Sequence, residues 1–429
     1  MFASTDTAIY NASNVAGGSL RTPTSGDWST VQQSTSGGQF LVGVNGADTG
    51  FTYNGSTFSD LALTGVSEDD LSQVWLFKSR LFFVEENTTS VWYLATDAIG
   101  GTVAELDLGS VFSKGGALLF GATWSLDSGS GLDDVCLFFS ETGEVAVYEG
   151  TDPSSASTWS LVGVYEIGRP LNKHAAFKAG GDLAVLTEDG IIPISEALRK
   201  DRAALQAVAI TYPIEDAWQD AIANRSVAFP INVTLWQKST LLLVGTPQKI
   251  NNQPVSFAAN ARTGAWSRII GWDVRCSAVF GDELYFGTDS GKVMKADVGG
   301  SDDGSAYSGY YVPKFAAMGT EAGATAVYLN YKATEELDFD MYAHADYQVD
   351  AMQAPAPFTT SSTTSWGTGV WGTFVWGSDS NAGTYNNWQS AYAHGSSMAS
   401  GLAITSNQTS KPTFEILVSK LRAEVGYQL

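Results

Sequence analysis

A short pattern of apolar and polar positions returns through the first 300 residues of the chain. Each copy has an apolar or aromatic strand, a tight polar turn with Gly or Asp, and a second strand. The clearest copy is DELYFGTDSGKVMKAD at 282–297, and five others lie at 38–55, 79–94, 133–150, 181–195 and 239–260. One hairpin cannot bury its apolar face alone, whereas hairpins stacked around an axis can, and a spacing of about 40–60 residues suits a β-propeller blade. The pattern therefore predicts a β-propeller of about six blades in residues 1–300.

Two copies extend into longer units that begin at Trp159 and Trp266. Each runs from a Trp-Ser pair through an apolar strand and a polar gap to a strand that ends in Phe177 or Phe280, and then to the hairpin. Such a unit holds about four strands, which is what a propeller blade needs. The alternative is a set of generic hairpins in a β-sandwich.

One stretch of the chain is typical of helices. Residues 195–209 (SEALRKDRAALQAVA) are rich in Ala, Leu, Arg and Lys, with Ser195 as the expected N-cap. Pro213 breaks this run, and 214–225 then predicts a second short helix. We expect the insert 195–225 either to cover the propeller rim or to contact a neighbouring subunit. In the second case the candidate interface residues are Leu198, Leu205 and Trp218.

The Gly-, Ser- and Asp-rich residues 298–312 mark an expected domain boundary, so that 301–429 forms a second domain. Alternating apolar and polar positions at 324–333 and 337–345, with a final apolar stretch at 414–429, predict a C-terminal β-sandwich-like domain. Its Gly/Ser/Thr-rich segment 361–390 contains four isolated tryptophans: Trp366, Trp371, Trp376 and Trp388. Their rings could fill a core, cover an interface or stack against sugars.

Composition agrees with an all-β protein, because aromatic residues and glycines are plentiful and only 16% of residues are charged. No apolar run reaches the roughly 20 residues that span a bilayer, so we expect no membrane insertion. The N-terminus lacks the pattern of a signal peptide. Two cysteines exclude a disulfide framework, and we expect Cys136 and Cys276 to be buried free thiols.

The net charge of −22 disfavours binding of nucleic acid, because cationic side chains are needed to neutralise phosphates. Residues 1–304 carry −17 of this charge and the remainder −5. An acidic wall would let a DNA duplex pass without capturing it, although solubility alone also explains an acidic surface.

Candidate chemistry is sparse. None of the three histidines has a metal-ligand spacing, and no nucleophile elbow, phosphate loop or dinucleotide fingerprint is present. We therefore expect no catalytic residue and no cofactor. Acidic side chains among glycines at 126–134 are weak calcium candidates: Asp127, Asp133 and Asp134. The acidic pairs Asp133/Asp134 and Glu335/Glu336 suit a glycosidase poorly, because neighbours on a strand point to opposite faces.

Long strings of this sequence resemble a known family, the tail nozzle (tail tubular B-type) proteins of short-tailed bacteriophages. The similarity extends over roughly 70–429 and is most specific at 78–101, 106–153, 159–171 and 178–195. The resemblance implies a non-enzymatic virion protein, made in the bacterial cytoplasm, that assembles below the portal and adaptor. It further implies a homo-oligomeric ring, a hexamer, that contacts tail fibre proteins and guides viral double-stranded DNA through its lumen without specific binding.

Two other functions stay open from the residues alone. The Trp-rich segment and the abundant carboxylates also suit a carbohydrate-binding or glycan-cleaving propeller, which needs a pocket with aromatic rings and two carboxyl groups. A general interaction propeller of a bacterial host is the third possibility.

Overall fold

A computed structural model describes residues 1–14, 17–125, 134–225, 230–333, 339–357, 383–407 and 413–425. The chain divides into two compact units, Met1–Ala296 and Asp297–Leu429. This division lies beside the boundary expected from the Gly/Ser/Asp-rich stretch. No helix in the described ranges is long and apolar enough to cross a membrane.

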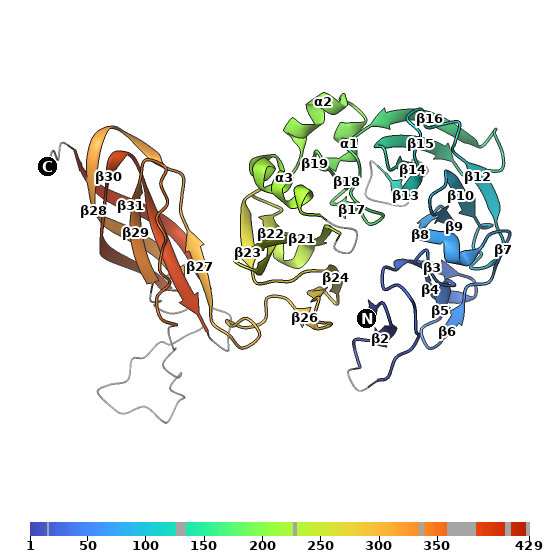
Figure 1. Ribbon diagram of the computed structural model, residues 1–429, viewed down its shortest axis with the longest axis horizontal. Helices are drawn as coiled ribbons and strands as arrows, with labels where there is room; N and C mark the ends of the chain where they lie inside the picture. The colour runs from blue at the N-terminus through green and yellow to red at the C-terminus, as the bar shows by residue number, and fades with distance from the viewer. Residues whose placement is uncertain are drawn as a thin grey trace. The chain divides into compact units, whose positions relative to one another are not determined.

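The first unit holds six antiparallel sheets of three or four strands, which follow one another around a circle (Figure 1). The first sheet contains β3 (Ser29–Thr35), β4 (Gly38–Val44), β5 (Phe51–Tyr53) and β6 (Phe58–Asp60). The second contains β8 (Leu71–Phe77), β9 (Arg80–Glu85), β10 (Ser90–Tyr93) and β12 (Ala104–Asp107). The third contains β13 (Leu118–Trp124), β14 (Val135–Ser140), β15 (Glu144–Gly150) and β16 (Trp159–Glu166).

The other half of the circle is built in the same way. The fourth sheet has only β17 (Ala176–Ala179), β18 (Asp182–Thr187) and β19 (Gly190–Pro193). The fifth has β20 (Asn232–Trp236), β21 (Leu241–Ile250), β22 (Gln253–Asn260) and β23 (Trp266–Ile270). The sixth has β24 (Cys276–Phe280), β25 (Glu283–Gly287) and β26 (Val293–Lys295).

Smaller elements accompany the six sheets. The chain starts with a separate hairpin of β1 (Phe2–Thr5) and β2 (Ala8–Asn11), and Phe2 packs edge-on against Tyr53 and Phe58 of the first sheet. A parallel pair joins β7 (Leu63–Thr64) to β11 (Gly101–Thr102). Outside the helical insert described below, the first unit also has the 3₁₀ turns η1 (Glu68–Asp70) and η4 (Gln237–Ser239).

The six hairpins read from the sequence are the second and third strands of the six sheets. For example, 282–297 forms β25 and β26, and 79–94 forms β9 and β10. The expected all-β fold with a six-bladed propeller is confirmed. The expected start of each four-strand unit was wrong, because the Trp-Ser strands close the preceding sheet. Trp159 begins β16, which pairs with β15, and Trp266 begins β23, which pairs with β22.

Apolar cores lie between consecutive sheets, so each sheet depends on its neighbours. Between the second and third sheets, Trp75, Phe82, Phe138 and Trp159 stack and meet edge-on. Gly121 makes room for this packing, since a Cβ there would lie 2.3 Å from the Trp75 ring. Burial of such large aromatic side chains provides most of the stabilisation of blade stacking.

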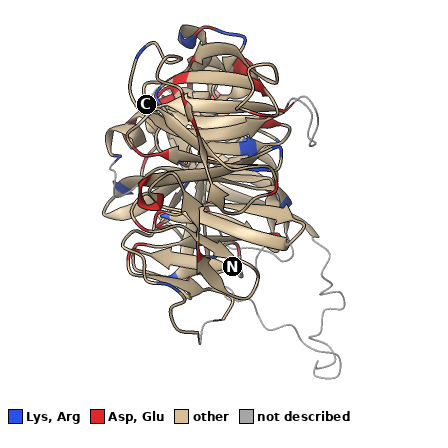
Figure 2. Cartoon of the chain, turned by 90° about the vertical axis from the view of Figure 1, so that its right-hand side faces the viewer, with Lys and Arg blue, Asp and Glu red and all other residues tan. Residues whose placement is uncertain are grey.

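Acidic residues occur on many separate elements, as the red segments of Figure 2 show. Of the two cysteines, Cys136 is buried as expected, whereas Cys276 is exposed on β24, and both are free thiols. The sequence prediction for Cys276 was wrong because β24 belongs to the last sheet, whose core lies on the side of the fifth sheet and whose other face is exposed among the described residues.

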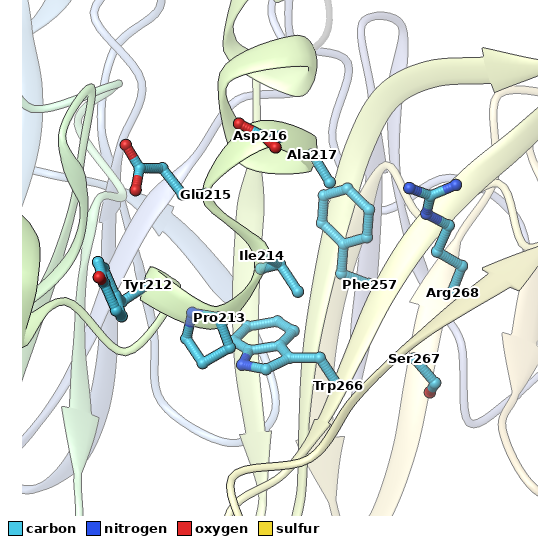
Figure 3. Close-up of a pocket in the computed structure, with 10 residues that line it drawn as sticks. All are labelled: Tyr212, Pro213, Ile214, Glu215, Asp216, Ala217, Phe257, Trp266, Ser267 and Arg268. Carbon is cyan, nitrogen blue, oxygen red and sulfur yellow. The ribbon is translucent and has the colours of Figure 1, made fainter. Parts of the chain in front are cut away.

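In the described residues, the helical insert follows β19 where the four-stranded sheets have a fourth strand. It consists of α1 (Ile194–Ala197), α2 (Arg202–Leu205), η2 (Gln206–Val208), η3 (Tyr212–Ile214) and α3 (Glu215–Ala223). Residues 195–209 therefore form short helices rather than one long helix. Ser195 is not an N-cap; it lies inside α1 and its hydroxyl donates to Asp182 Oδ2 at 2.6 Å. The insert and the fifth sheet line an open cavity of about 640 Å³ (Figure 3).

The second unit is a curled five-stranded sheet. It contains β27 (Tyr307–Tyr311), β28 (Ala316–Ala333), β29 (Phe339–Ala345), β30 (Gly383–Ser406) and β31 (Phe414–Val425). One half of β30 pairs with β28, and its last residues pair with β27 on one side and β29 on the other. Irregular pairings in β28 accompany this curl. The curl encloses a core that includes Val327, Leu329, Tyr331, Phe339 and Met341.

Candidate functional site

The first strand of each sheet is its inner strand, nearest the propeller axis. The chain segments that lead into these inner strands meet at one end of the axis and border a cavity of about 430 Å³. Asp27 precedes β3, Lys173 and His174 precede β17, and Ile231 precedes β20. Ser72 and Leu118 add the starts of β8 and β13. Five of the six blades thus contribute to this cavity, which is the position where a propeller can hold a ligand or tie its blades together.

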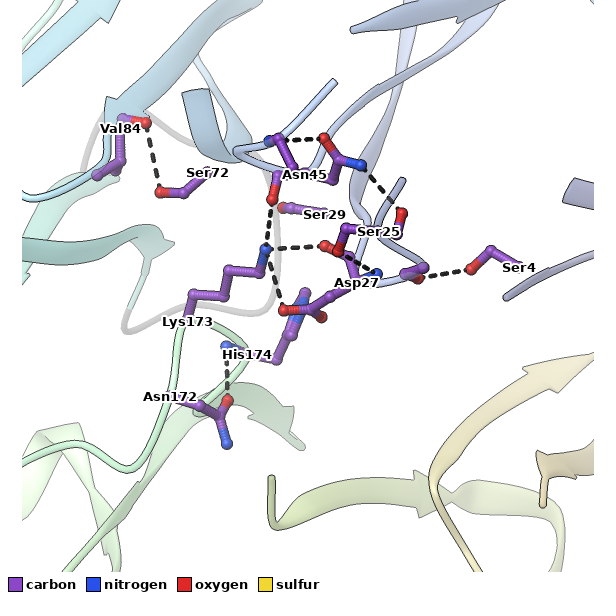
Figure 4. Close-up of polar contacts among 12 residues, drawn as sticks. Ser4, Ser25, Asp27, Ser29, Asn45, Ser72, Val84, Asn172, Lys173 and His174 are labelled. Carbon is purple, nitrogen blue, oxygen red and sulfur yellow. Dashed lines mark hydrogen bonds and ion pairs between the residues drawn. The ribbon is translucent and has the colours of Figure 1, made fainter. Parts of the chain in front are cut away.

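A charged cluster links the first and fourth sheets across this cavity (Figure 4). The ammonium group of Lys173 donates to the backbone carbonyls of Asp27 at 2.8 Å and Asn45 at 3.2 Å, and lies 3.1 Å from the Asp27 carboxylate. His174 Nε2 lies 2.8 Å from the other carboxylate oxygen of Asp27. The Lys173 side chain is only 13% exposed, whereas that of Asp27 is 55% exposed. We call Asp27, Lys173 and His174 the axial clasp.

The axial clasp changes the protonation of its carboxylate. Burial by itself would raise the pKa of Asp27. The hydrogen bond and charge of His174, followed by the charge and hydrogen bond of Lys173, outweigh burial and hold this pKa well below its usual range. Asp27 is therefore ionised at neutral pH, which suits a structural ion pair better than an acid or base catalyst.

Polar side chains also tie neighbouring inner strands together. Asn172, which accepts from the His174 backbone amide, donates to the Ile231 carbonyl at 2.8 Å. Gln73 donates to and accepts from the backbone of Gly121. The bonds of Asn172 to Ile231 and of Gln73 to Gly121 join one blade to the next, so the wall of the axis is held by directional contacts as well as by apolar packing.

Because the axial clasp bridges opposite blades, the axis of a single propeller is not an open passage for DNA. The residues around the cavity carry both signs of charge, with Glu86 and Glu141 opposed by Lys173 and Arg225.

The calcium candidates lie mostly outside the described residues. Asp127 and Asp133 lie outside the described residues, as do Glu335 and Glu336, and only Asp134 is described. Among the described side chains, no three of His, Cys, Asp or Glu are grouped as metal ligands would be.

Two of the three interface candidates are core residues. Leu205 and Trp218 are 0% and 1% exposed and pack in the core shared by the third, fourth and fifth sheets, while Leu198 is partly buried against it. The side chains of Leu205 and Trp218 are therefore not available to a neighbouring subunit. The sequence could not reveal this burial, because an apolar helix face fits an internal core as well as an interface.

Exposed apolar side chains occur at several places in the described part of the first unit, for example Ile270 on β23, and two of these places hold a group of them. One is the face of the sixth sheet that points away from its core with the fifth sheet. Cross-strand pairing puts Cys276, Ala278 and Phe280 on this face, and Phe280 is 51% exposed. Val293 of β26 is on the same face and 43% exposed. No strand pairing in the described residues joins this sheet to the first sheet or to the N-terminal hairpin.

The second place is β16, the edge strand of the third sheet. Among the described strands it pairs with β15 alone, and three of its apolar side chains are 38–50% exposed: Leu161, Val162 and Val164. An edge strand with exposed apolar side chains is a surface that another chain can cover. Figure 1 shows β16 and the sixth sheet at separate positions on the circle.

The Trp-rich segment is described only in part. Trp366, Trp371 and Trp376 lie outside the described residues. Trp388 of β30 is 57% exposed and its ring centroid lies 4.8 Å from that of Tyr328.

Comparison with known proteins does not assign this chain to a family. No family model matches the sequence, and no curated protein matches it. The fold places the chain among β-propeller proteins with an additional β unit, and this assignment rests on its own sheets.

Three solved structures illustrate the likeness. The computationally designed Ika8 protein is 12% identical, with 68% of this chain and 78% of that chain covered and a TM-score of 0.38. The β-propeller domain of Nup133 from Vanderwaltozyma polyspora is 13% identical over 67% and 78%, with a TM-score of 0.31. YCF48 from Cyanidioschyzon merolae is 8% identical over 60% and 65%, with a TM-score of 0.25. Identities and TM-scores this low say nothing about function.

Proposed function

We propose that this protein is a structural subunit of a closed homo-oligomeric ring, the tail nozzle of a short-tailed bacteriophage. The observation that carries the proposal is the pair of unlike apolar surfaces on the propeller, one on β16 and one on the sixth sheet. A ring needs head-to-tail contacts, in which one surface of each subunit meets a different surface of the next. Two unlike surfaces at separate positions on one rigid scaffold meet this need.

The resemblance of 78–195 to tail nozzle proteins supports the same assignment and supplies its biological setting. The subunit then belongs to the virion, is made in the bacterial cytoplasm, and contacts the portal, the adaptor and tail fibre proteins. The DNA channel is the space enclosed by the ring, a hexamer by family resemblance, since the axial clasp bridges each propeller's own axis. The net charge of −22 keeps a passing duplex from adhering to this wall.

The test is the mass and shape of the purified chain, alone and mixed with phage neck components, by light scattering and negative-stain imaging. We expect rings with a central hole, formed either by the chain alone or on its adaptor. Phe280→Ser and Val162→Ser should each abolish rings, because each removes one of the two surfaces, while both variants keep a folded monomer. Tyr10→Ser, at an exposed aromatic residue of the N-terminal hairpin, is the matched control and should still form rings.

A persistent wild-type monomer that ignores neck components would refute the proposal. Rings that survive both Phe280→Ser and Val162→Ser would show that subunits meet through other surfaces.

A further inference from the structure

The cavity between the helical insert and the fifth sheet has the properties of a ligand site (Figure 3). Its volume of about 640 Å³ lies within the range of about 300–1,000 Å³ that is usual for small-molecule sites. It is lined by η3, the first turn of α3 and the two outer strands β22 and β23. The site arises because the fourth sheet has three strands, so that helices rather than a strand face the outer part of the fifth sheet.

Aromatic side chains form the apolar part of the lining. Trp266 is partly buried at the start of β23, and Phe257 of β22 is almost fully buried behind it. Tyr212 of η3 lies on the opposite side and is 54% exposed. In Figure 3 the Trp266 indole lies beside Pro213 and Ile214, below the charged groups. The cavity thus offers aromatic surface to an apolar patch of a ligand.

Charged groups of both signs complete the lining. Arg268 pairs across the strands with Phe257 and lies on the same face of β23 as Trp266, because side chains alternate along a strand. The carboxylates of Glu215 and Asp216 come from the first turn of α3. Glu215 accepts from Gln206, but within the described residues neither Asp216 nor Arg268 has a hydrogen bond or ion pair. Their donors and acceptors remain available to a ligand.

This combination fits a polyhydroxylated molecule. A saccharide ring presents C–H groups on its faces and hydroxyl groups around its rim, and each hydroxyl both donates and accepts. The faces match the aromatic side chains, and the rim matches a carboxylate acceptor and a guanidinium donor placed on opposite walls. We propose that this cavity binds a neutral oligosaccharide.

Charge decides against an acidic saccharide. Two carboxylates and one guanidinium line the cavity, and the whole chain carries −22, so a polyanion is repelled at long range and at contact. The proposal is independent of the ring function, because the cavity belongs to one propeller unit. It also differs from the interpretation of the Trp-rich segment, since none of the lining residues lies in 361–390.

The experiment measures binding to the full-length chain by saturation-transfer NMR and calorimetry. The probes are maltohexaose, cellohexaose and chitohexaose as neutral saccharides, a polygalacturonate oligomer as the anionic control, and a proline-rich basic peptide as the competing class. We expect saturable binding of at least one neutral saccharide and none of the other two probes. Asp216→Ala, Arg268→Ala and Tyr212→Ala should each weaken binding about tenfold or more.

Arg262→Ala is the matched control for Arg268→Ala, because it removes the same charge from the exposed loop just before β23. It should leave binding unchanged. The proposal is overturned if no neutral saccharide binds, if only the peptide binds, or if binding is insensitive to all three cavity variants. Binding that is lost on Trp388→Ala instead would place a saccharide site in the second unit and equally overturn it. Circular dichroism of each variant separates loss of binding from loss of folding.

Discussion

At the residue scale, Lys173 shows how one side chain can join distant parts of a propeller. Its ammonium group contacts the carbonyl of Asp27, 146 positions away in the sequence, and that of Asn45. Three oxygens surround the amine of this largely buried side chain, which satisfies its three donors. The axial clasp therefore fixes the distance between the first and fourth sheets.

A double-mutant cycle should measure this contact. Asp27→Asn and Lys173→Met should couple by no more than about 1 kcal/mol, because the Asp27 side chain is 55% exposed and water screens the pair. The pKa of Asp27 is lower in the folded protein than its ordinary value of 3.8. The coupling should thus be constant above about pH 4 and decline only below it, as Asp27 takes up a proton. Urea unfolding at several pH values tests this, and a coupling that falls between pH 7 and pH 5 would contradict it.

His344 provides a second test at this scale. It is 1% exposed in the second unit, and neither ring nitrogen has a hydrogen-bond partner among the described residues. Burial lowers its pKa from 6.5, and Asp350 opposes this only in part. The unfolded chain then binds the proton more readily, so stability should be lost as pH falls below about 6.5.

Hydrogen exchange of β29 and β30, corrected for intrinsic rates, should show lower protection at about pH 5.5 than at about pH 7.5. In His344→Met this pH dependence should largely disappear, because a neutral side chain replaces the titrating one. Equal pH dependence in both proteins would show that another group is responsible.

At the element scale, the helical insert is part of the core. Trp218 of α3 is 1% exposed, and its indole nitrogen donates to the Thr187 carbonyl of β18. The helix thus completes a sheet that has only three strands. Alanine and leucine content identified the helices, but it did not reveal that their apolar face covers the fourth and fifth sheets.

Trp218→Ala should reduce the free energy of unfolding by about 3–5 kcal/mol, because it leaves a cavity and an unpaired carbonyl in the core. Tyr212→Ala, at a neighbouring residue that is 54% exposed, should cost less than about 1 kcal/mol. Chemical denaturation followed by circular dichroism compares the two. A small loss for Trp218→Ala would mean that the insert packs loosely on the propeller.

At the scale of the whole molecule, charge opposes assembly. Each copy carries −22, so identical copies repel one another in the proposed ring. Raising the salt concentration from about 0.02 M to about 0.3 M shortens the range of this repulsion. Ring formation should therefore strengthen with salt, and sedimentation velocity at the two concentrations measures the change. Rings that dissociate as salt is added would show that ion pairs, rather than apolar surfaces, hold the subunits together.

The sequence by itself determined the local units of this protein. Each hairpin, such as 282–297, is written in alternating apolar positions and a turn that holds glycine, because both strands and their pairing lie within about 20 residues. Six such hairpins were enough to predict the propeller. The lack of metal or nucleophile motifs was also read directly from residue types and spacing.

Only the tertiary structure decided how these units meet. It showed that Trp159 closes the third sheet instead of opening the fourth, that Trp218 is core, and that Lys173 reaches Asp27. It also brought Tyr212 and Trp266 into one cavity. The physical reason is the same in each case: alternation fixes which face of a strand or helix is apolar, but the partner of that face is chosen by packing between segments far apart in the chain.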